Sequence, residues 1–217
     1  MALKAAQELF KPELVTDLIN KVQGKSSVAI LSNQTPIPFN GTEQFVFSMD
    51  KEVDIVAENA AKSEGGISLD SVKIVPIKLE YGARVSDEFL FASEEARVEV
   101  LKAFNEGFAM KVARGIDLMI FHGVNPRSGE ASSVIGDNHM DKKVTQTVQI
   151  TPDDPDASVE TAVGLVQGSG GVVNGMAMAP TFATALAKMV DGSGKRFPEL
   201  AWGANPRSVN GLPTDVN

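Results

Sequence analysis

Few residues of this chain have types and spacing that could perform chemistry. The sequence contains no cysteine and only two histidines, which excludes disulfides, thiolate catalysis and cysteine-ligated metals. His122 follows Asp117 closely, as in an acid/base pair, but a histidine in the last turn of a helix is favoured by the helix dipole alone. No serine has a histidine placed for it by a recognisable motif. The sequence predicts no catalytic site.

Two polar stretches have the composition of ligand sites. Gly168-Ser-Gly-Gly171 could cradle a phosphate, but it follows an expected helix and precedes an expected strand, whereas a cradle places its amides at a helix N-terminus. Asp153, Asp154 and Asp156 could hold a cation, yet the glycine and the terminal glutamate of a calcium loop are missing. We therefore interpret these stretches as a turn and a helix cap, and we expect no cofactor and no metal.

Composition limits the class of protein. The chain has 217 residues and a net charge of -8, enough for one or two domains with a core but unfavourable for a dedicated nucleic-acid binder. No apolar run is long enough to cross a bilayer, and no signal-peptide pattern opens the sequence. These features predict a soluble protein that is cytoplasmic when made.

A long helix over residues 93–121 organises the rest of the chain. Apolar residues recur in steps of three and four and predict one buried face: Val98, Leu101, Phe104, Phe108, Val112, Ile116 and Met119. Charged residues, Asp117 among them, are expected on a solvent-facing sector. Ser93 offers a cap at one end, and Gly123 offers a left-handed stop at the other. At about 1.5 Å per residue this helix is longer than a compact domain of this size needs. We interpret it as a spine that supports other elements.

A β-ribbon is expected before this helix. Strict alternation over 45–57 predicts a long strand with one polar face, and a return strand covers 72–81 with a register slip at Val75-Pro76. The polar stretch 58–66 forms the tip. Because a lone two-stranded ribbon is marginal in water, it needs another surface to lie on.

The remaining elements are shorter. Residues 12–24 predict an amphipathic arm helix, 26–31 and 35–39 extended segments, 124–141 a loop and 144–150 another alternating stretch. Residues 157–167, 172–178 and 180–190 predict a helix, a strand and a helix, hence a compact α/β unit. No strand is expected after 191 to complete its sheet. We therefore expect the natural protein to be longer than 217 residues.

The order of these elements, with Ala57-Glu-Asn-Ala-Ala-Lys-Ser63 before the return strand and Val85-Ser-Asp-Glu-Phe-Leu90 before the spine, resembles the major capsid proteins of tailed bacteriophages, the Hong Kong 97 type. The resemblance implies an α+β fold with four parts. These are an N-terminal arm (1–41), an extended β-hairpin loop (42–82), a peripheral domain with the spine helix (83–150) and an axial domain, incomplete here (151–217). Some members crosslink through a loop lysine, and Lys51 and Lys62 lie in that region, but nothing identifies an acceptor.

The resemblance implies a structural subunit, not an enzyme, that self-assembles as pentamers and hexamers into an icosahedral phage or prophage head around double-stranded DNA. The implied partners are other copies of the chain, a separate scaffolding protein, and portal and head-decoration proteins. Contact with packaged DNA would be non-specific, and no membrane is involved. The implied location is the virion capsid, with assembly in the host cytoplasm.

Two alternatives stay open at this stage. An encapsulin-like nanocompartment shares the fold and differs in enclosing protein, whereas a small-molecule binder or enzyme would use the α/β unit. The ribbon favours a shell, because a lattice protein buries such an arm on a neighbour. The expected inter-subunit contacts are Glu94 and Arg97 at the start of the spine, and Glu58 and Lys62 at the ribbon tip.

Overall fold

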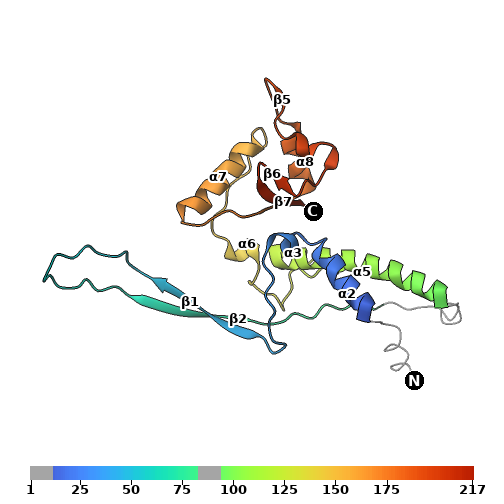
Figure 1. Cartoon of the computed structure of the whole chain (residues 1–217), viewed down its shortest axis with the longest axis horizontal. Coiled ribbons are helices and arrows are strands. Elements are labelled where there is room, and N and C mark those ends of the chain that lie inside the picture. Colours follow the sequence, from blue (N-terminus) through green and yellow to red (C-terminus); the bar gives the residue numbers. More distant parts are fainter. Residues whose placement is uncertain (1–11, 83–93) are drawn as a thin grey trace. The chain divides into compact units, whose positions relative to one another are not determined.

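The computed structural model describes residues 12–82 and 94–217, without the side chains of 12–15 and 94–98. Helices and strands are mixed, as expected for an α+β chain. The chain divides into two compact units, of which one is the segment Gln34–Gly82 and the other contains the remaining elements (Figure 1). None of the described helices is long and apolar enough to span a bilayer.

The spine helix α5 runs from Glu94 to His122, close to the expected bounds. Helices α2 (Pro12–Gln23) and α3 (Ser27–Leu31) both pack against it. The buried positions of α5 include Asn105, Ala109, Ala113 and Asp117, four residues apart, where small or polar side chains let another helix approach. The apolar side chains that were expected to be buried, from Leu101 to Met119, are only partly buried. The buried face is therefore rotated from the expected one, and the placement of Asp117 on the solvent side was wrong.

The segment Gln34–Gly82 contains one antiparallel ribbon. Strand β1 (Thr42–Met49) pairs with β2 (Ile67–Ile74), from Thr42 opposite Ile74 to Met49 opposite Ile67. Both strands are shorter than expected, since 50–66 and 75–81 form no ladder. The expected register slip at Val75-Pro76 is absent, because β2 ends at Ile74 before the proline that cannot donate a hydrogen bond.

The C-terminal part is an α/β unit. Its helices and three-stranded sheet are α6 (Met140–Lys143), α7 (Pro155–Gly168), α8 (Pro180–Lys188), 3-10 helix η1 (Pro198–Gly203), β3 (Met176–Met178), β6 (Ser208–Val209) and β7 (Leu212–Val216). The strand order is β3-β7-β6, with β3 parallel and β6 antiparallel to β7. A small hairpin of β4 (Val190–Asp191) and β5 (Gly194–Lys195) projects beside α8.

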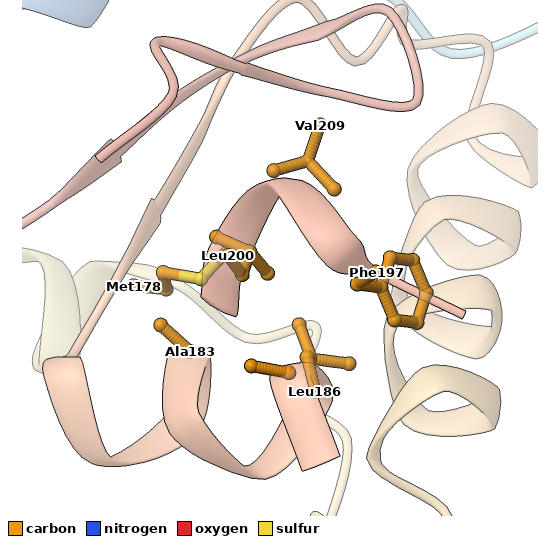
Figure 2. Close-up of a cluster of buried hydrophobic side chains, with 7 residues drawn as sticks. Met178, Ala183, Leu186, Phe197, Leu200 and Val209 are labelled. Carbon is orange, nitrogen blue, oxygen red and sulfur yellow. The ribbon is translucent and has the colours of Figure 1, made fainter. Parts of the chain in front are cut away.

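The apolar core lies within this unit. Leu186 of α8, Leu200 of η1 and Phe197 just before η1 are buried with Met178 of β3 and Val209 of β6 (Figure 2). Helix α8 therefore packs on the sheet and on η1 together. This core fixes the backbone that carries the exposed residues of the same unit.

Several expected elements differ. Residues 27–31 form a helix, because Ser26 caps it with a side chain that accepts from the Ala29 amide, 3.2 Å away. Residues 144–150 form no strand, since nothing pairs with them. The strand expected over 172–178 is confined to its last residues. The tail after 191, expected to lack strands, supplies β5, β6 and β7, among them the central strand β7.

Candidate functional site

The two faces of the β1-β2 ribbon differ in chemistry. On the face with odd-numbered residues, Phe47 lies opposite Leu69 and Met49 opposite Ile67. Together with Phe45 these form what we call the odd face, and each of the five side chains is between 57% and 67% exposed. On the even face, Ser48 and Ser68 share a hydrogen bond of 2.6 Å between their hydroxyls. The even face also carries the exposed Val46 and Val72, so it is the larger apolar side chains that are concentrated on the odd face, as at sites that bind a partner.

The connection 50–66 between the strands is held by few internal contacts. Asp50 accepts from the Gly66 amide at 2.6 Å, and Lys51 Nζ donates to the Glu64 carbonyl at 2.9 Å. Glu58 lies in a turn at the tip and Lys62 lies beyond it, both exposed. Among the described residues, neither Glu58 nor Lys62 has a side-chain partner that would make it reactive. Their role as inter-subunit contacts stays a prediction.

Glu94 and Arg97 lie in the first turn of α5, but their side chains are outside the described part of the chain. Their expected role in docking is therefore untested. The next exposed charged residues of α5 are Glu99 and Lys102.

A buried polar junction joins α3, α5 and β7. The Asp117 side chain, whose residue is 8% exposed, accepts from Ser26 Oγ at 2.6 Å, from the Ser27 amide at 3.0 Å and from the Val28 amide at 3.1 Å. Asn217 Nδ2 donates at 2.7 Å to Asp117 Oδ2, which also accepts from the Ser27 amide. Asp117 Oδ1 accepts the other two hydrogen bonds, so each carboxylate oxygen has two donors. A buried charge needs such donors, because leaving water without them costs several kcal/mol.

A second carboxylate extends this junction. Asp215 of β7 accepts from Ser27 Oγ at 2.5 Å and from Asn205 Nδ2 at 2.9 Å. Asn205 in turn accepts from the Val216 amide at 3.2 Å. The two serines at the start of α3 therefore bind one carboxylate from the spine helix and one from the sheet. The junction therefore has a structural role, since its polar side chains form hydrogen bonds with other parts of the chain.

The remaining candidates have ordinary partners. His122 Nδ1 lies 2.7 Å from an Asp141 carboxylate oxygen, not beside Asp117, and both side chains are exposed. Asp154 caps α7 by accepting from the Ala157 amide at 3.1 Å, and Asp156 pairs with Arg196 at 2.6 Å. Residues 168–171 end α7 as a turn, with the Gly171 amide donating to the Val166 carbonyl. Over residues 12–82 and 94–217 no cluster of His, Asp and Glu is placed to hold a metal ion.

Comparison with known proteins gives the family. A model described as the phage capsid family matches residues 7–217. The chain belongs to this family. No curated protein sequence matches the chain.

Two solved structures share the fold of this capsid-family chain. A chain from Mycobacterium phage Ogopogo superposes with a TM-score of 0.71 at 30% identity, and the match covers 89% of this chain. A chain from Gordonia phage Cozz gives a TM-score of 0.60 at 20% identity over 88% of this chain, which is evidence of fold alone. The matches cover 64% and 61% of those two chains, so this chain spans less than two thirds of either.

Sequence reasoning missed the polar junction of this capsid-family chain, although two signals were present. Asp117 is the lone carboxylate in the apolar second half of the spine helix, and such a charge is buried only with donors. Ser26 and Ser27 precede a short apolar run, which is typical of a helix cap. Neither signal shows that these groups meet, since they lie far apart in the chain.

Proposed function

We propose that this protein is a major capsid protein that self-assembles into an icosahedral phage shell around double-stranded DNA. Family membership supports this, because the family is a structural one that implies assembly with other copies of the chain. The observation that carries the proposal is the exposed odd face of the ribbon. A monomer has no use for a row of exposed Phe45, Phe47 and Met49, whereas a lattice repeats one contact in every copy.

The proposal includes the four-part division of the chain, with the ribbon as the extended loop (42–82). The loop of each subunit lies on the neighbouring subunit, and the start of the spine helix, with Glu94 and Arg97, provides docking charges. Pentamers and hexamers of the protein form the shell, assisted by a scaffolding protein and completed by portal and head-decoration proteins. Assembly takes place in the host cytoplasm. No observation favours the encapsulin-like alternative or an enzyme.

Expression of the full-length protein tests the proposal. Electron microscopy should show closed particles, formed by the protein alone or with its scaffold supplied. Particles recovered from infected cells should contain nucleic acid, whereas a cargo shell would contain protein. A full-length protein that stays monomeric at high concentration, even with its scaffold, would exclude the shell function.

Charge reversal at the start of α5 tests the docking residues separately. Glu94→Lys combined with Arg97→Glu should reduce particle yield in sedimentation, because rim ion pairs of about 0.2 to 1 kcal/mol are repeated in every copy of the lattice. Glu99→Lys combined with Lys102→Glu is the matched control, since these exposed residues belong to the same helix. Circular dichroism should be unchanged for both variants. Equal yields would remove Glu94 and Arg97 from the interface.

A further inference from the structure

Trp202 is presented to solvent in an unusual way. It is the single tryptophan of the sequence, and its side chain is 99% exposed. Its backbone lies in the left-handed region, with φ 61° and ψ 25°, which is uncommon for a bulky residue. A conformation of this kind costs of order 1 to 3 kcal/mol and persists only where the surrounding structure imposes it. The exposed indole and the strained backbone are both energetically unfavourable in the free subunit. This indicates that Trp202 has a function.

The flanking residues fix Trp202 in this position. Leu200 is 2% exposed and belongs to the apolar core, as does Phe197 at the start of the same segment (Figure 2). Gly203 continues the left-handed turn with φ 74°. The indole is thus mounted on anchored backbone, so its binding to a partner would require little ordering of the chain.

A lysine lies beside the indole. Lys195 Nζ lies 5.6 Å from the centre of the Trp202 ring, a cation-π distance. The β4-β5 turn that carries Lys195 is fixed by Asp191, which accepts from the Ser193 hydroxyl at 2.6 Å and from its amide at 2.7 Å. These two hydrogen bonds, the hydroxyl first, lower the pKa of the Asp191 carboxyl. The carboxylate form that holds the turn is therefore favoured.

The charge of this segment differs from that of the rest of the chain. Residues 188–207 contain four basic residues and two acidic ones, a net charge of +2, with Arg196 paired to Asp156 outside the segment. Because the whole sequence carries -8, the remaining residues carry -10. The rest of a second copy therefore carries net negative charge, which is complementary to the positive charge of this segment, and such complementarity favours association.

We propose that Trp202 and Lys195 form an anchor that docks onto an acidic surface of a second copy of this chain in the assembled shell. The proposal rests on the shell function. A tryptophan supplies roughly 200 Å² of buried area, well below the roughly 800 Å² per partner of a stable interface. The anchor is thus one part of a larger repeated contact, and tryptophan is the residue type most often found at such energetic centres.

The tryptophan itself reports on the proposal. The emission of Trp202 is the difference between the native spectrum and that of Trp202→Phe. We expect this difference spectrum to shift to shorter wavelength, and acrylamide quenching to fall, when free subunits assemble. Assembled shells in which Trp202 emission and quenching stay as in the free subunit would overturn the anchor while leaving the shell function intact.

Variants give a second, independent readout. Trp202→Ala and Lys195→Glu should each lower particle yield, by about tenfold for the tryptophan if it is an energetic centre of the contact. The matched controls are Val172→Ala, an exposed apolar residue of the same unit, and Lys111→Glu, an exposed lysine of α5. Circular dichroism of the free subunits should be unchanged in all four. Equal yields for anchor and control variants would contradict the proposal.

Nucleic acid is the other partner that a basic, aromatic patch could bind. Free subunits should therefore be titrated with duplex DNA while Trp202 emission is recorded. No change in emission is expected, because the acidic remainder of the chain repels phosphates. Quenching by DNA, with unchanged emission on assembly, would replace the second copy by nucleic acid and overturn the proposal. If the native full-length protein forms no shell, the anchor and the shell function fail together.

Discussion

At the scale of single residues, Asp117 has the largest structural consequence. Its two carboxylate oxygens accept four hydrogen bonds from Ser26, Ser27, Val28 and Asn217, although the residue is almost fully buried. Hydrogen bonds to a charged acceptor are stronger than neutral ones, and each donor here would be left unsatisfied without it. This carboxylate therefore couples the segment before the ribbon to the spine helix.

Asp117→Asn should destabilise the protein. The amide replaces one acceptor by a donor that faces existing donors, which should lower the free energy of unfolding by about 3 kcal/mol. Thermal unfolding followed by circular dichroism measures the change. The control is Asp153→Asn, an exposed aspartate just before α7, which should leave the midpoint within error. A midpoint for Asp117→Asn equal to that of the control would show that the junction adds no stability.

Gly123 is a second residue with a specific structural requirement. It ends α5 with φ 66°, and a Cβ placed there would lie 2.4 Å from His139 Cδ2. Gly129, in the loop that follows, has φ 74° but open space around the same position. The two glycines share the left-handed backbone and differ only in crowding.

Gly123→Ala should therefore cost more stability than Gly129→Ala. The left-handed backbone alone costs an alanine roughly 1 to 2 kcal/mol at either site, and only Gly123→Ala must also displace the His139 ring. Chemical denaturation of both variants measures the difference in the free energy of unfolding. Equal losses would indicate that the His139 ring moves aside without cost.

At the scale of elements, the chemistry of the ribbon is set by which of its two faces each side chain occupies. Successive residues of a strand point to opposite faces, so the pairing of Phe47 with Leu69 places five apolar side chains on the odd face. A two-stranded ribbon is marginally stable by itself. Its apolar face therefore has more to contribute to an interface than to the stability of the free subunit.

Phe47→Ser combined with Leu69→Ser should lower particle yield strongly. The matched control is Val46→Ser combined with Val72→Ser, which removes apolar area from the even face of the same two strands. Sedimentation of assembly reactions gives the yield, and circular dichroism checks that the subunits fold. An equal loss for the two pairs would mean that both faces are buried, or that general weakening of the ribbon is the cause.

At the scale of the whole molecule, the two compact units differ in the interactions that stabilise them. The unit with the spine helix has an apolar core and the buried polar junction, whereas Gln34–Gly82 has one ladder and a sparsely bonded connection. Regions with few buried contacts open at low free-energy cost. Self-assembly would bury what the second unit exposes.

Limited proteolysis should first cleave the connection 50–66 in free subunits and spare it in assembled particles. The internal comparison is the loop 124–139, where Ile135 is buried and the Asn125 amide donates to the Glu130 carbonyl at 2.7 Å. Mass spectrometry of the first fragments locates the cut. First cleavage in 124–139, with 50–66 intact in the free subunit, would contradict the expected weakness of the ribbon.

Local patterns in the sequence determined much of this protein. The steps of three and four along α5 and the proline at the start of α8 depend on neighbours in the chain, so these helices were predicted with small errors in length. The alternation that begins at Phe45 predicted a strand, but the strand ends at Met49 and not at residue 57. The order of these elements also led to the capsid family, which the family comparison confirms.

Only the tertiary structure decided which distant residues meet. Residues 27–31 are a helix because Ser26 and Asp117 bind their amides, and a carboxylate from the spine helix cannot be inferred from a window around Ser26. The tail supplies β7 because β3 pairs with it, and the position of Trp202 follows from anchoring at Leu200. The physical reason is the same in each case. Burial and hydrogen bonding between segments far apart in the chain outweigh the local preferences that a sequence pattern records.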